Sequence, residues 1–394
     1  MRAYALLSGC YFASVGLFNP YAPLWFQSLG FSTLLIGGLS ALQSSTRVFA
    51  PYAWGWWGDH RGRRVALIRL AAVGTLMCAL ALLGVRQAWA VAVVTTLLFI
   101  ANGGIVPLYE ATLAQLLNTA TGVDPQRYGR VRVWGSVGFI LSVTLFGALL
   151  EHVGIGVFPA FVAAVNGLML WAAWRLPVAR DETHFDEPAP PVLGLLRQPR
   201  VAWFFASVFF TVLAHTSLYA FFSLYLVQLG LGKTAIGALW AVSVAVEIVF
   251  FWYQGRWFGR WPALAWLKGV AVATALRFVA VALAGLAFEP GAGGGRWVPL
   301  GLAVLVLAQC SHAITFAAHH SACIQLVQHH FPGRLRGRGQ ALYATLGYGA
   351  SGVVGGLGGG WLIQQHGYAA VFVAAALAGI LAWYCVHRAQ RCSA

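Results

Sequence analysis

Charged side chains are scarce in this 394-residue chain. Asp, Glu, Lys and Arg together make up 9% of it, against about 25% in an average soluble domain. Apolar residues make up 60%, more than a soluble core can account for, so most of the chain is expected to lie in lipid. Each bilayer crossing takes about 20 residues. The sequence therefore has room for twelve transmembrane helices joined by short loops.

Clustered metal ligands are also lacking. The six cysteines are scattered, mostly in or beside apolar runs and without CxxC spacing: Cys10, Cys78, Cys310, Cys323, Cys385 and Cys392. We therefore expect free, apolar-packed thiols, no metal site and no cofactor. A desaturase-like membrane enzyme would need histidine clusters at HxxxH and HxxHH spacing, which the pairs at His319 and His329 do not supply. An enzyme is not expected.

Acidic residues number only 10, and the net charge is +15. In a soluble protein such an excess would suggest nucleic-acid binding. Here the basic residues form short clusters between apolar runs, a pattern that orients membrane helices, so no nucleic-acid partner is expected. With Arg2 in the cytoplasm, the alternating loops place 20 Lys and Arg inside and 3 outside, and Arg47 and Arg277 fall within helices. This predicts cytoplasmic termini in a bacterial-type inner (plasma) membrane.

Twelve apolar runs are long enough to span a bilayer. The first has no small-residue cleavage site, so we expect it to remain as a helix rather than be removed as a signal peptide. The runs lie at about 4–27, 35–57, 65–85, 89–117, 129–150, 155–174, 200–228, 235–257, 263–287, 298–327, 339–363 and 368–387.

A polar, proline-containing segment separates the sixth run from the seventh. It predicts a cytoplasmic linker at 177–199 between an N-terminal six-helix bundle at 1–176 and a C-terminal one at 200–394. A faint repeat agrees with this duplication, because 147–154 (GALLEHVG) resembles 360–367 (GWLIQQHG). The predicted fold is therefore an all-α polytopic membrane protein with two pseudo-symmetric six-helix bundles.

The loop after the second run carries a motif. It reads Gly55-Trp-Trp-Gly-Asp59-His-Arg-Gly62-Arg63-Arg64 and resembles the G-x-x-x-D-x-x-G-R-R signature of the major facilitator superfamily. Asp59 can form charge-assisted contacts with arginines, while Gly55 and Gly62 allow close approach and a tight turn. A plain positive-inside loop would need neither the acid nor the glycines. We therefore predict a cytoplasmic gate, on one side only, because 255–260 lacks the acid.

Ionisable residues inside the apolar runs are few and costly, and such residues almost always face a bundle interior. Five of them fall near mid-depth on five different helices, which predicts one shared polar cavity that binds the substrate. Glu110 lies nearer the cytoplasm. The five are Arg47, His215, Glu247, Arg277 and His312.

Glu247 is the best candidate to carry a proton, because a carboxyl group can bind and release one as its surroundings change, whereas arginine stays charged. Arg277 is its natural counter-ion, and His312 could tune proton release. The alternative is a buried structural ion pair between helices eight and nine.

Two helices carry polar rows. In helix ten, Gln309, His312, Phe316, His319 and Cys323 follow helical spacing, and in helix seven Thr211, His215, Tyr219 and Phe222 do so. Each histidine could relay protons or bind an anion, but could equally be a hydrogen-bonded packing residue. In the N-terminal half, Asn19, Gln43 and Asn102 could line the facing wall, and Arg47 could grip a carboxylate through two parallel hydrogen bonds.

Several segments resemble the phenylpropionate permease family of the major facilitator superfamily, related to lactose permease and nucleoside symporters. They are Tyr128 to Phe139, Leu239-Trp240 through Glu247, Arg277, and His312 with His319. The resemblance implies proton symport of an aromatic carboxylate such as 3-phenylpropionate. It adds Trp240 to the binding residues and, by analogy with lactose permease, pairs Glu110 with Arg132.

The sequence thus predicts a monomeric, proton-coupled importer of a small organic anion that works by alternating access in the lipid bilayer. Glu247, Arg277 and His312 would couple protons, and Arg47, His215, His319, Asn19, Gln43, Glu110, Tyr219 and Trp240 would bind substrate. Alternatives are a symporter for a nucleoside or oligosaccharide, a proton-driven exporter of drugs or metabolites, and a membrane sensor. The absence of proline from 135–147 argues against a drug exporter.

Overall fold

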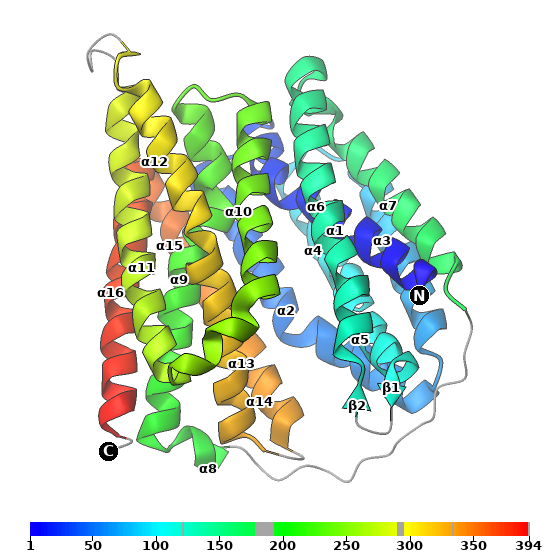
Figure 1. Ribbon diagram of the computed structural model, residues 1–394. Helices are drawn as coiled ribbons and strands as arrows, with labels where there is room; N and C mark the ends of the chain where they lie inside the picture. Colours follow the sequence, from blue (N-terminus) through cyan, green and yellow to red (C-terminus); the bar gives the residue numbers. More distant parts are fainter. Residues whose placement is uncertain (120–121, 178–192, 290–294, 333–334, 393–394) are drawn as a thin grey trace. The chain divides into compact units, whose positions relative to one another are not determined.

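The computed structural model describes residues 1–119, 122–177, 193–289, 295–332 and 335–392, without the side chains of Asp59, Arg61 and a few residues beside the gaps. Most of the predicted linker at 177–199 lies outside these ranges. The described chain consists almost entirely of helices (Figure 1). The all-α fold class predicted from the sequence is confirmed, with one short strand pair as an addition.

In the N-terminal part the elements are α1 (Arg2–Ser28), α2 (Thr33–Arg61), α3 (Arg64–Ala81), α4 (Ala88–Asn102), α5 (Ile105–Leu116), β1 (Asn118–Thr119), β2 (Gly122–Val123), α6 (Pro125–Val153), η1 (Ile155–Val157) and α7 (Phe158–Trp174). In the C-terminal part they are α8 (Leu193–Leu196), α9 (Pro199–Gln228), α10 (Lys233–Tyr253), η2 (Gln254–Arg256), η3 (Phe258–Arg260), α11 (Ala263–Ala284), η4 (Gly285–Phe288), α12 (Val298–Cys310), η6 (Ala313–Ala318), α13 (His319–His330), α14 (Arg336–Leu342), η8 (Tyr343–Ala350), α15 (Ser351–His366) and α16 (Tyr368–Arg391). Of these, η6 and η8 are π-helical.

Within the described ranges, nine helical stretches are long and apolar enough to cross a membrane by length and composition. The three other predicted spans are occupied by α1, α2 and the continuous run α14–η8–α15. These carry more polar or small residues, such as the stretch 43–47 in α2 and the glycines of α15, which lowers their hydropathy. The twelve predicted spans therefore all form helices, with ends within a few residues of those expected.

Contacts divide the chain into two compact units. The first unit is Met1–Phe31 with Ser45–Glu187, and the second unit is Ser32–Ser44 with Pro188–Ala394. Helix α2 is shared between them. In the second unit its first turns pack on α15, where the Thr33 hydroxyl donates to the Gly360 carbonyl oxygen over 3.2 Å. Glycines permit this approach, since a Cβ on Gly356 would collide with the backbone of Gly37.

The core of the first unit joins α1, α3, α5 and α7 through buried side chains such as Leu7, Ile68 and Leu113. Helix α1 also packs closely along α6, because Gly138 lies against the backbone of Gly9 and Gly16 against that of Phe139. This packing holds polar residues of α5 and α6 beside α1.

In the second unit α9 packs against α15 and α16, and α16 packs against α11. Its core includes Phe204, Val270 and Val327. The arrangement leaves α10, α11 and the run α12–η6–α13 in mutual contact, and these helices bring together the principal polar cluster of this unit.

Matching turns occur in both halves of the chain. Gly154, between α6 and α7, has φ of 85°, and Gly367, between α15 and α16, has φ of 79°. Gly30 and Gly230 both have φ of 81° after α1 and α9. Left-handed backbone favours glycine. The repeat at 147–154 and 360–367 therefore ends in the same local conformation in both copies.

Candidate functional site

Arg277, in the middle of α11, is the centre of a buried polar cluster. Its side chain is almost fully enclosed, with 3% of the residue exposed. Its Nη1 donates to Thr315 Oγ1 and contacts His312 Nδ1, each over 2.9 Å, and Nη2 donates to Gln309 Oε1 over 2.7 Å. Gln309 in turn donates to the Leu239 carbonyl oxygen over 3.3 Å. The guanidinium thereby links α11 to α12 and η6, and through Gln309 to α10.

The Arg277 contact sets the tautomer of His312. A guanidinium can only donate hydrogen bonds, so Nδ1 of His312 must accept and its proton must lie on Nε2. That Nε2 atom faces Glu247 Oε2 at 3.9 Å. Glu247, His312 and Arg277 thus form a chain in this order. The imidazole ring therefore lies between the two charges of the expected counter-ion pair.

The negative charge of Glu247 balances the positive charge of Arg277. An isolated buried cation is expensive, because it loses hydration that hydrogen bonds to neutral groups replace only in part. The second unit contains only two acidic residues, Glu247 and Glu289. Glu289 lies about 18 Å along α11 from Arg277, at a rise of 1.5 Å per residue. Glu247, with 21% of its side chain exposed, is therefore the acid that compensates Arg277.

A π-helical segment begins directly after His312. In η6 the helix is wider than an α-helix, so the expected row along helix ten is displaced. His312 stacks on Phe316 with ring centroids 5.0 Å apart, and Phe316 stacks on His320, not on His319, with centroids 6.4 Å apart. Regular helical spacing predicts His319 in this row and His320 beside it.

His319 instead contacts Cys323 one turn later, with Nε2 3.3 Å from Sγ, and both residues are buried. His320 Nδ1 lies 3.4 Å from the Tyr343 hydroxyl, which contacts that of Tyr348 at 3.2 Å. His319 and His320 therefore contact a second polar group next to η8, and neither is among the hydrogen-bond partners of Arg277.

His215, on α9, lies beside His312, with ring centroids 6.0 Å apart. Its Nδ1 is 2.8 Å from the Thr211 carbonyl oxygen, an acceptor, so this nitrogen carries the proton. Its Nε2 is then an acceptor, and it is buried without a hydrogen-bond partner among the described residues. Nearby, Tyr219 stacks on Trp240 with centroids 6.1 Å apart. These predicted binding residues therefore adjoin the Arg277 cluster.

In the first unit, Glu110 of α5 and Arg132 of α6 form an ion pair, with Oε1 and Nε 3.1 Å apart. This is the pair that the resemblance to lactose permease implies. Tyr128 donates to Glu110 Oε2 over 2.6 Å, and the Arg132 guanidinium lies over the ring of Phe12 at 4.6 Å. The pair is partly exposed, so its charges remain accessible to a ligand.

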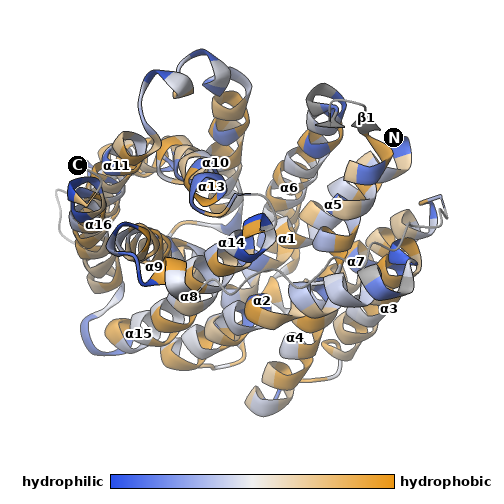
Figure 2. Cartoon of the chain, turned by 90° about the horizontal axis from the view of Figure 1, so that it is seen from below, coloured by the Kyte–Doolittle hydropathy of each residue, from blue (hydrophilic) through white to orange (hydrophobic). Residues whose placement is uncertain are grey.

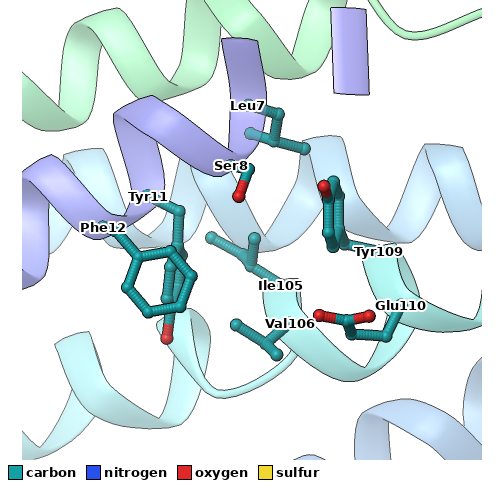
Figure 3. A pocket seen from close by; sticks show the side chains of 8 residues that line it. All are labelled: Leu7, Ser8, Tyr11, Phe12, Ile105, Val106, Tyr109 and Glu110. Carbon is teal, nitrogen blue, oxygen red and sulfur yellow. The ribbon is translucent and has the colours of Figure 1, made fainter. Parts of the chain in front are cut away.

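A small pocket adjoins this pair between α1 and α5 (Figure 3). The hydroxyls of Ser8 and Tyr109 are buried in it and lie close to each other. Arg47 and Arg132 both lie close enough to Tyr11 to act electrostatically on its hydroxyl. The pocket is lined by Leu7, Ser8, Tyr11, Phe12, Ile105, Val106, Tyr109 and Glu110.

We expect Glu110→Gln and Arg132→Gln each to lower transport by about tenfold, or about 1.4 kcal/mol. The double variant should lose little more, because either change breaks the same contact and contacting residues are not additive. Initial uptake rates at equal protein amounts measure the effect. A matched control is Asp124→Asn with Arg127→Gln, whose ion pair is more exposed and should matter less than about twofold. Additive losses, or an equal loss in the control, would contradict the prediction.

The remaining predicted binding residues lie in both units. Asn19 of α1 is partly buried in the first unit, and Arg47 of α2 is exposed there. Gln43, one turn before Arg47, is partly buried and is grouped with the second unit. Arg47 is thus the member of the predicted mid-depth set that belongs to the first unit, while the other four gather in the second.

The predicted gate motif covers the end of α2 and the start of α3. Gly62 has φ of 56° between the two helices, as a tight turn requires. Arg64 Nη1 donates to Gln115 over 3.3 Å, and Arg63 is exposed. The tight approach is at Gly58, where a Cβ would meet Leu108, and not at Gly55, where the space is open. The side chain of Asp59 lies outside the described residues.

Sequence reasoning missed several groups at both sites. Thr315 follows His312 by three residues, but threonine is common in membrane helices as packing glue. Tyr128 was visible only as part of the family-like segment. Ser8, Tyr11 and Tyr109 gave no charge signal, and their convergence depends on how α1 packs on α5. Over the described residues, no group of three or more His, Cys, Asp and Glu could hold a metal, and all six cysteines are free.

The model of the MFS_1 like family matches residues 4–374. The chain is 27% identical over 377 residues to the probable 3-phenylpropionic acid transporter of Escherichia coli (strain K12), covering 93% of this chain and 92% of that protein. It is 27% identical to the maltose permease of Geobacillus stearothermophilus, over 92% and 87% of the two chains.

Among solved structures, a mutant of the nucleoside transporter NupG aligns with a TM-score of 0.84 at 17% identity. The alignment covers 98% of this chain and 99% of that one. At this identity the likeness concerns the fold.

Proposed function

Because the chain belongs to the MFS_1 like family, we propose that it is a proton-coupled importer of a small organic anion, with an aromatic carboxylate such as 3-phenylpropionate as the first candidate. Family membership makes it a multi-pass membrane transporter of a small molecule and not an enzyme. Proton coupling, the direction of transport and the substrate are our proposal.

The observation that carries the proposal is the row of three contacting side chains Glu247, His312 and Arg277 inside the second unit. Buried ionisable groups inside membrane helices are costly, and they typically mark ion pathways or proton relays. Glu247 is partly exposed while Arg277 is enclosed, so a proton can reach the carboxylate without reaching the guanidinium. In this proposal Glu247 binds the proton, and His312 transmits the change in charge to Arg277.

Charge balance provides the coupling. When Glu247 is ionised, the negative charge of its carboxylate cancels the positive charge of the Arg277 guanidinium. When Glu247 binds a proton, the positive charge of Arg277 is left without its acidic partner. A bound anion restores neutrality, so protonation favours the binding of an anion and the anion favours protonation, as reciprocal linkage requires. Movement of one proton with one monovalent anion is then electroneutral.

Cations of the first unit support an anionic substrate as well. Arg47 and Arg132 both act on Tyr11 beside the small pocket, whereas Glu110 is the acid paired with Arg132. Two guanidiniums against one carboxylate leave a net positive charge, and a guanidinium can bind a carboxylate through two parallel hydrogen bonds. The named activity of the Escherichia coli relative, transport of 3-phenylpropionic acid, agrees with this substrate class.

A nucleoside or oligosaccharide is the second candidate substrate, and His215 favours it. Its unpartnered Nε2 accepts a hydrogen bond, so a ligand hydroxyl or N–H would satisfy it while a carboxylate would not. The fold of the nucleoside transporter and the sequence of the maltose permease are compatible with such a substrate.

The proposed orientation rests on the distribution of positive charge. The ratio of 20 Lys and Arg on one side to 3 on the other supports cytoplasmic termini in an inner membrane. The repeated turns at Gly30 and Gly230, and at Gly154 and Gly367, support a duplicated architecture that works by alternating access. We further propose that the monomer is the transporting unit.

Proton flux into liposomes tests the proposal. Purified protein is reconstituted into liposomes that contain a pH-sensitive dye. 3-phenylpropionate, uridine or maltose is then added outside, without an imposed pH gradient. Acidification by 3-phenylpropionate that exceeds both protein-free liposomes and Glu247→Gln liposomes is the expected result. These controls are necessary because the neutral acid itself crosses bilayers. Acidification by uridine or maltose alone would move the assignment to the second candidate, and the absence of proton movement with all three would reject proton symport.

A further inference from the structure

Basic and aromatic side chains converge at one end of the second unit, away from the Arg277 cluster. The last turns of α16 lie there beside the first turns of α9 and α11. Helix α16 packs on both of these helices, and its C-terminal end is strongly hydrophilic (Figure 2). The group comprises Trp203, Lys268, Trp383, Tyr384, His387, Arg388 and Arg391, and we call it the α16 basic cluster.

Two rows on α16 organise the cluster. Trp383, His387 and Arg391 follow one another at intervals of four residues, and so do Tyr384 and Arg388, so each row lies along one face of the helix. The rings of Trp383 and His387 stack with centroids 5.5 Å apart and an angle of 7°. Arg391 lies about 12 Å further along the helix axis than Trp383. The aromatic ring of Trp383 therefore lies closer to the middle of the helix than Arg391, which is the order expected at a membrane interface.

Neighbouring helices hold the cations over aromatic rings. Lys268 of α11 lies over Trp383 at 5.6 Å and donates to Gln390 Oε1 over 2.9 Å. Arg388 lies over Trp203 of α9 at 5.0 Å and donates to the Tyr384 hydroxyl over 2.8 Å. Lys268, Arg388 and Arg391 all act electrostatically on His387. Lys268 and Arg388 are thus held by neutral partners, and all three cations lie near His387.

Among the residues that the structure describes, no side-chain carboxylate of the second unit contacts the cluster. This unit contains 13 Lys and Arg but only two acidic residues. Glu247 is engaged with His312, and Glu289 lies at the opposite end of α11, about 31 Å from Lys268 along the helix. Three like charges held together repel one another, so an anion from outside the unit would stabilise them. Trp383 and Tyr384 are 38% and 43% exposed, which leaves the cluster open on its outer face.

We propose that Lys268, Arg388 and Arg391 bind the phosphate group of an anionic phospholipid, with Trp383 and Tyr384 against its glycerol and upper acyl region. An arginine can hold a phosphate through paired hydrogen bonds, and lysine adds a point charge. Aromatic rings at the boundary suit a lipid better than a free phosphate ion, since amphipathic rings favour that depth. Basic pockets between transmembrane helices are suited to anionic headgroups.

Lipid titration of the purified transporter tests this site. Detergent-solubilised protein is titrated with phosphatidylglycerol or phosphatidylcholine, and bound lipid is counted by native mass spectrometry. The wild type is expected to retain phosphatidylglycerol at least tenfold more tightly than phosphatidylcholine. The triple variant Lys268→Gln, Arg388→Gln, Arg391→Gln should lose this preference. Raised salt should weaken phosphatidylglycerol retention in the wild type, because the attraction is electrostatic.

Matched variants separate this site from general charge. Replacing Arg256, Arg260 and Arg336 of the same unit by glutamine removes as many positive charges and should change phosphatidylglycerol retention by less than twofold. The charge-preserving triple Lys268→Arg, Arg388→Lys, Arg391→Lys should stay within about threefold of the wild type, which guards against misfolding of the neutral variant. Equal loss in the control triple, or no preference over phosphatidylcholine, would overturn the proposal. Displacement of the lipid by millimolar inorganic phosphate would instead identify a free-phosphate site and overturn it too.

Discussion

Replacing Glu247 by glutamine should abolish accumulation driven by a pH gradient while leaving exchange of preloaded substrate. Glutamine keeps the size of the side chain but cannot release a proton, and it leaves the charge of Arg277 permanently uncompensated beside His312. For one proton per anion, a gradient of one pH unit supports about tenfold accumulation, since it is worth about 1.4 kcal/mol. The wild type should approach that ratio and the variant should stay near one. Radiolabelled substrate in liposomes with imposed pH gradients measures it.

Glu289→Gln is the matched control for this experiment. It makes the same chemical change in the same unit, at the far end of α11 from the cluster, and Glu289 is exposed. Accumulation in this variant should remain within about twofold of the wild type. If Glu247→Gln still accumulates substrate tenfold, the carboxylate does not carry the coupled proton, and the alternative of a purely structural ion pair would be preferred.

Replacing Arg277 by glutamine should reduce transport by at least about a hundredfold and also destabilise the protein. Removing one member of a buried charge pair leaves the other uncompensated, which typically costs about 3–5 kcal/mol. Three hydrogen bonds, to His312, Thr315 and Gln309, would be lost or weakened at the same time. Arg277→Lys should also fail to transport, because a single ammonium group cannot reach all three acceptors in the geometry of a guanidinium.

A double variant distinguishes the electrostatic cause from simple misfolding. In Arg277→Gln with Glu247→Gln both charges are gone, so thermal stability should recover most of the loss while transport stays absent. The apparent unfolding midpoint in detergent measures stability, and Arg296→Gln, an exposed cation of the same unit, is the control. A double variant that is as unstable as Arg277→Gln would show that the two charges do not compensate each other.

The positions of the helices could be predicted closely from sequence because the bilayer restricts them. A run of about 20 apolar residues leaves little freedom, so the span expected at 200–228 forms a helix at Pro199–Gln228. Breaks within a helical run are harder to predict from the sequence. The run at 89–117 breaks at Gly103 and Gly104, where a Cβ on Gly104 would collide with Trp54. That break depends on the approach of α2, which no local pattern reveals.

For the candidate site too, some features can be predicted from the sequence and others depend on the packing of the helices. Charged residues within membrane helices can be recognised from the sequence, because each is costly and therefore functional or paired. Four of the five predicted mid-depth residues lie together in the second unit. Their order could not be read from spacing. His312 lies between Glu247 and Arg277, and a π-helical segment moves His320 rather than His319 onto Phe316. A helical row assumes 3.6 residues per turn, and the assumption fails where the turn widens.

Hydrophobic length and the cost of burying charge both act along the chain. The all-α membrane fold and the charged residues within its helices can therefore be predicted from the sequence alone. The packing of the helices shows which of these residues touch, which nitrogen of His312 holds its proton, and that Ser8 and Tyr109 share a pocket with Glu110. Those outcomes depend on helix rotation and on distances of a few ångströms between segments far apart in sequence. Hydrogen bonds and ion pairs are sensitive to such distances, whereas hydrophobic burial is not directional.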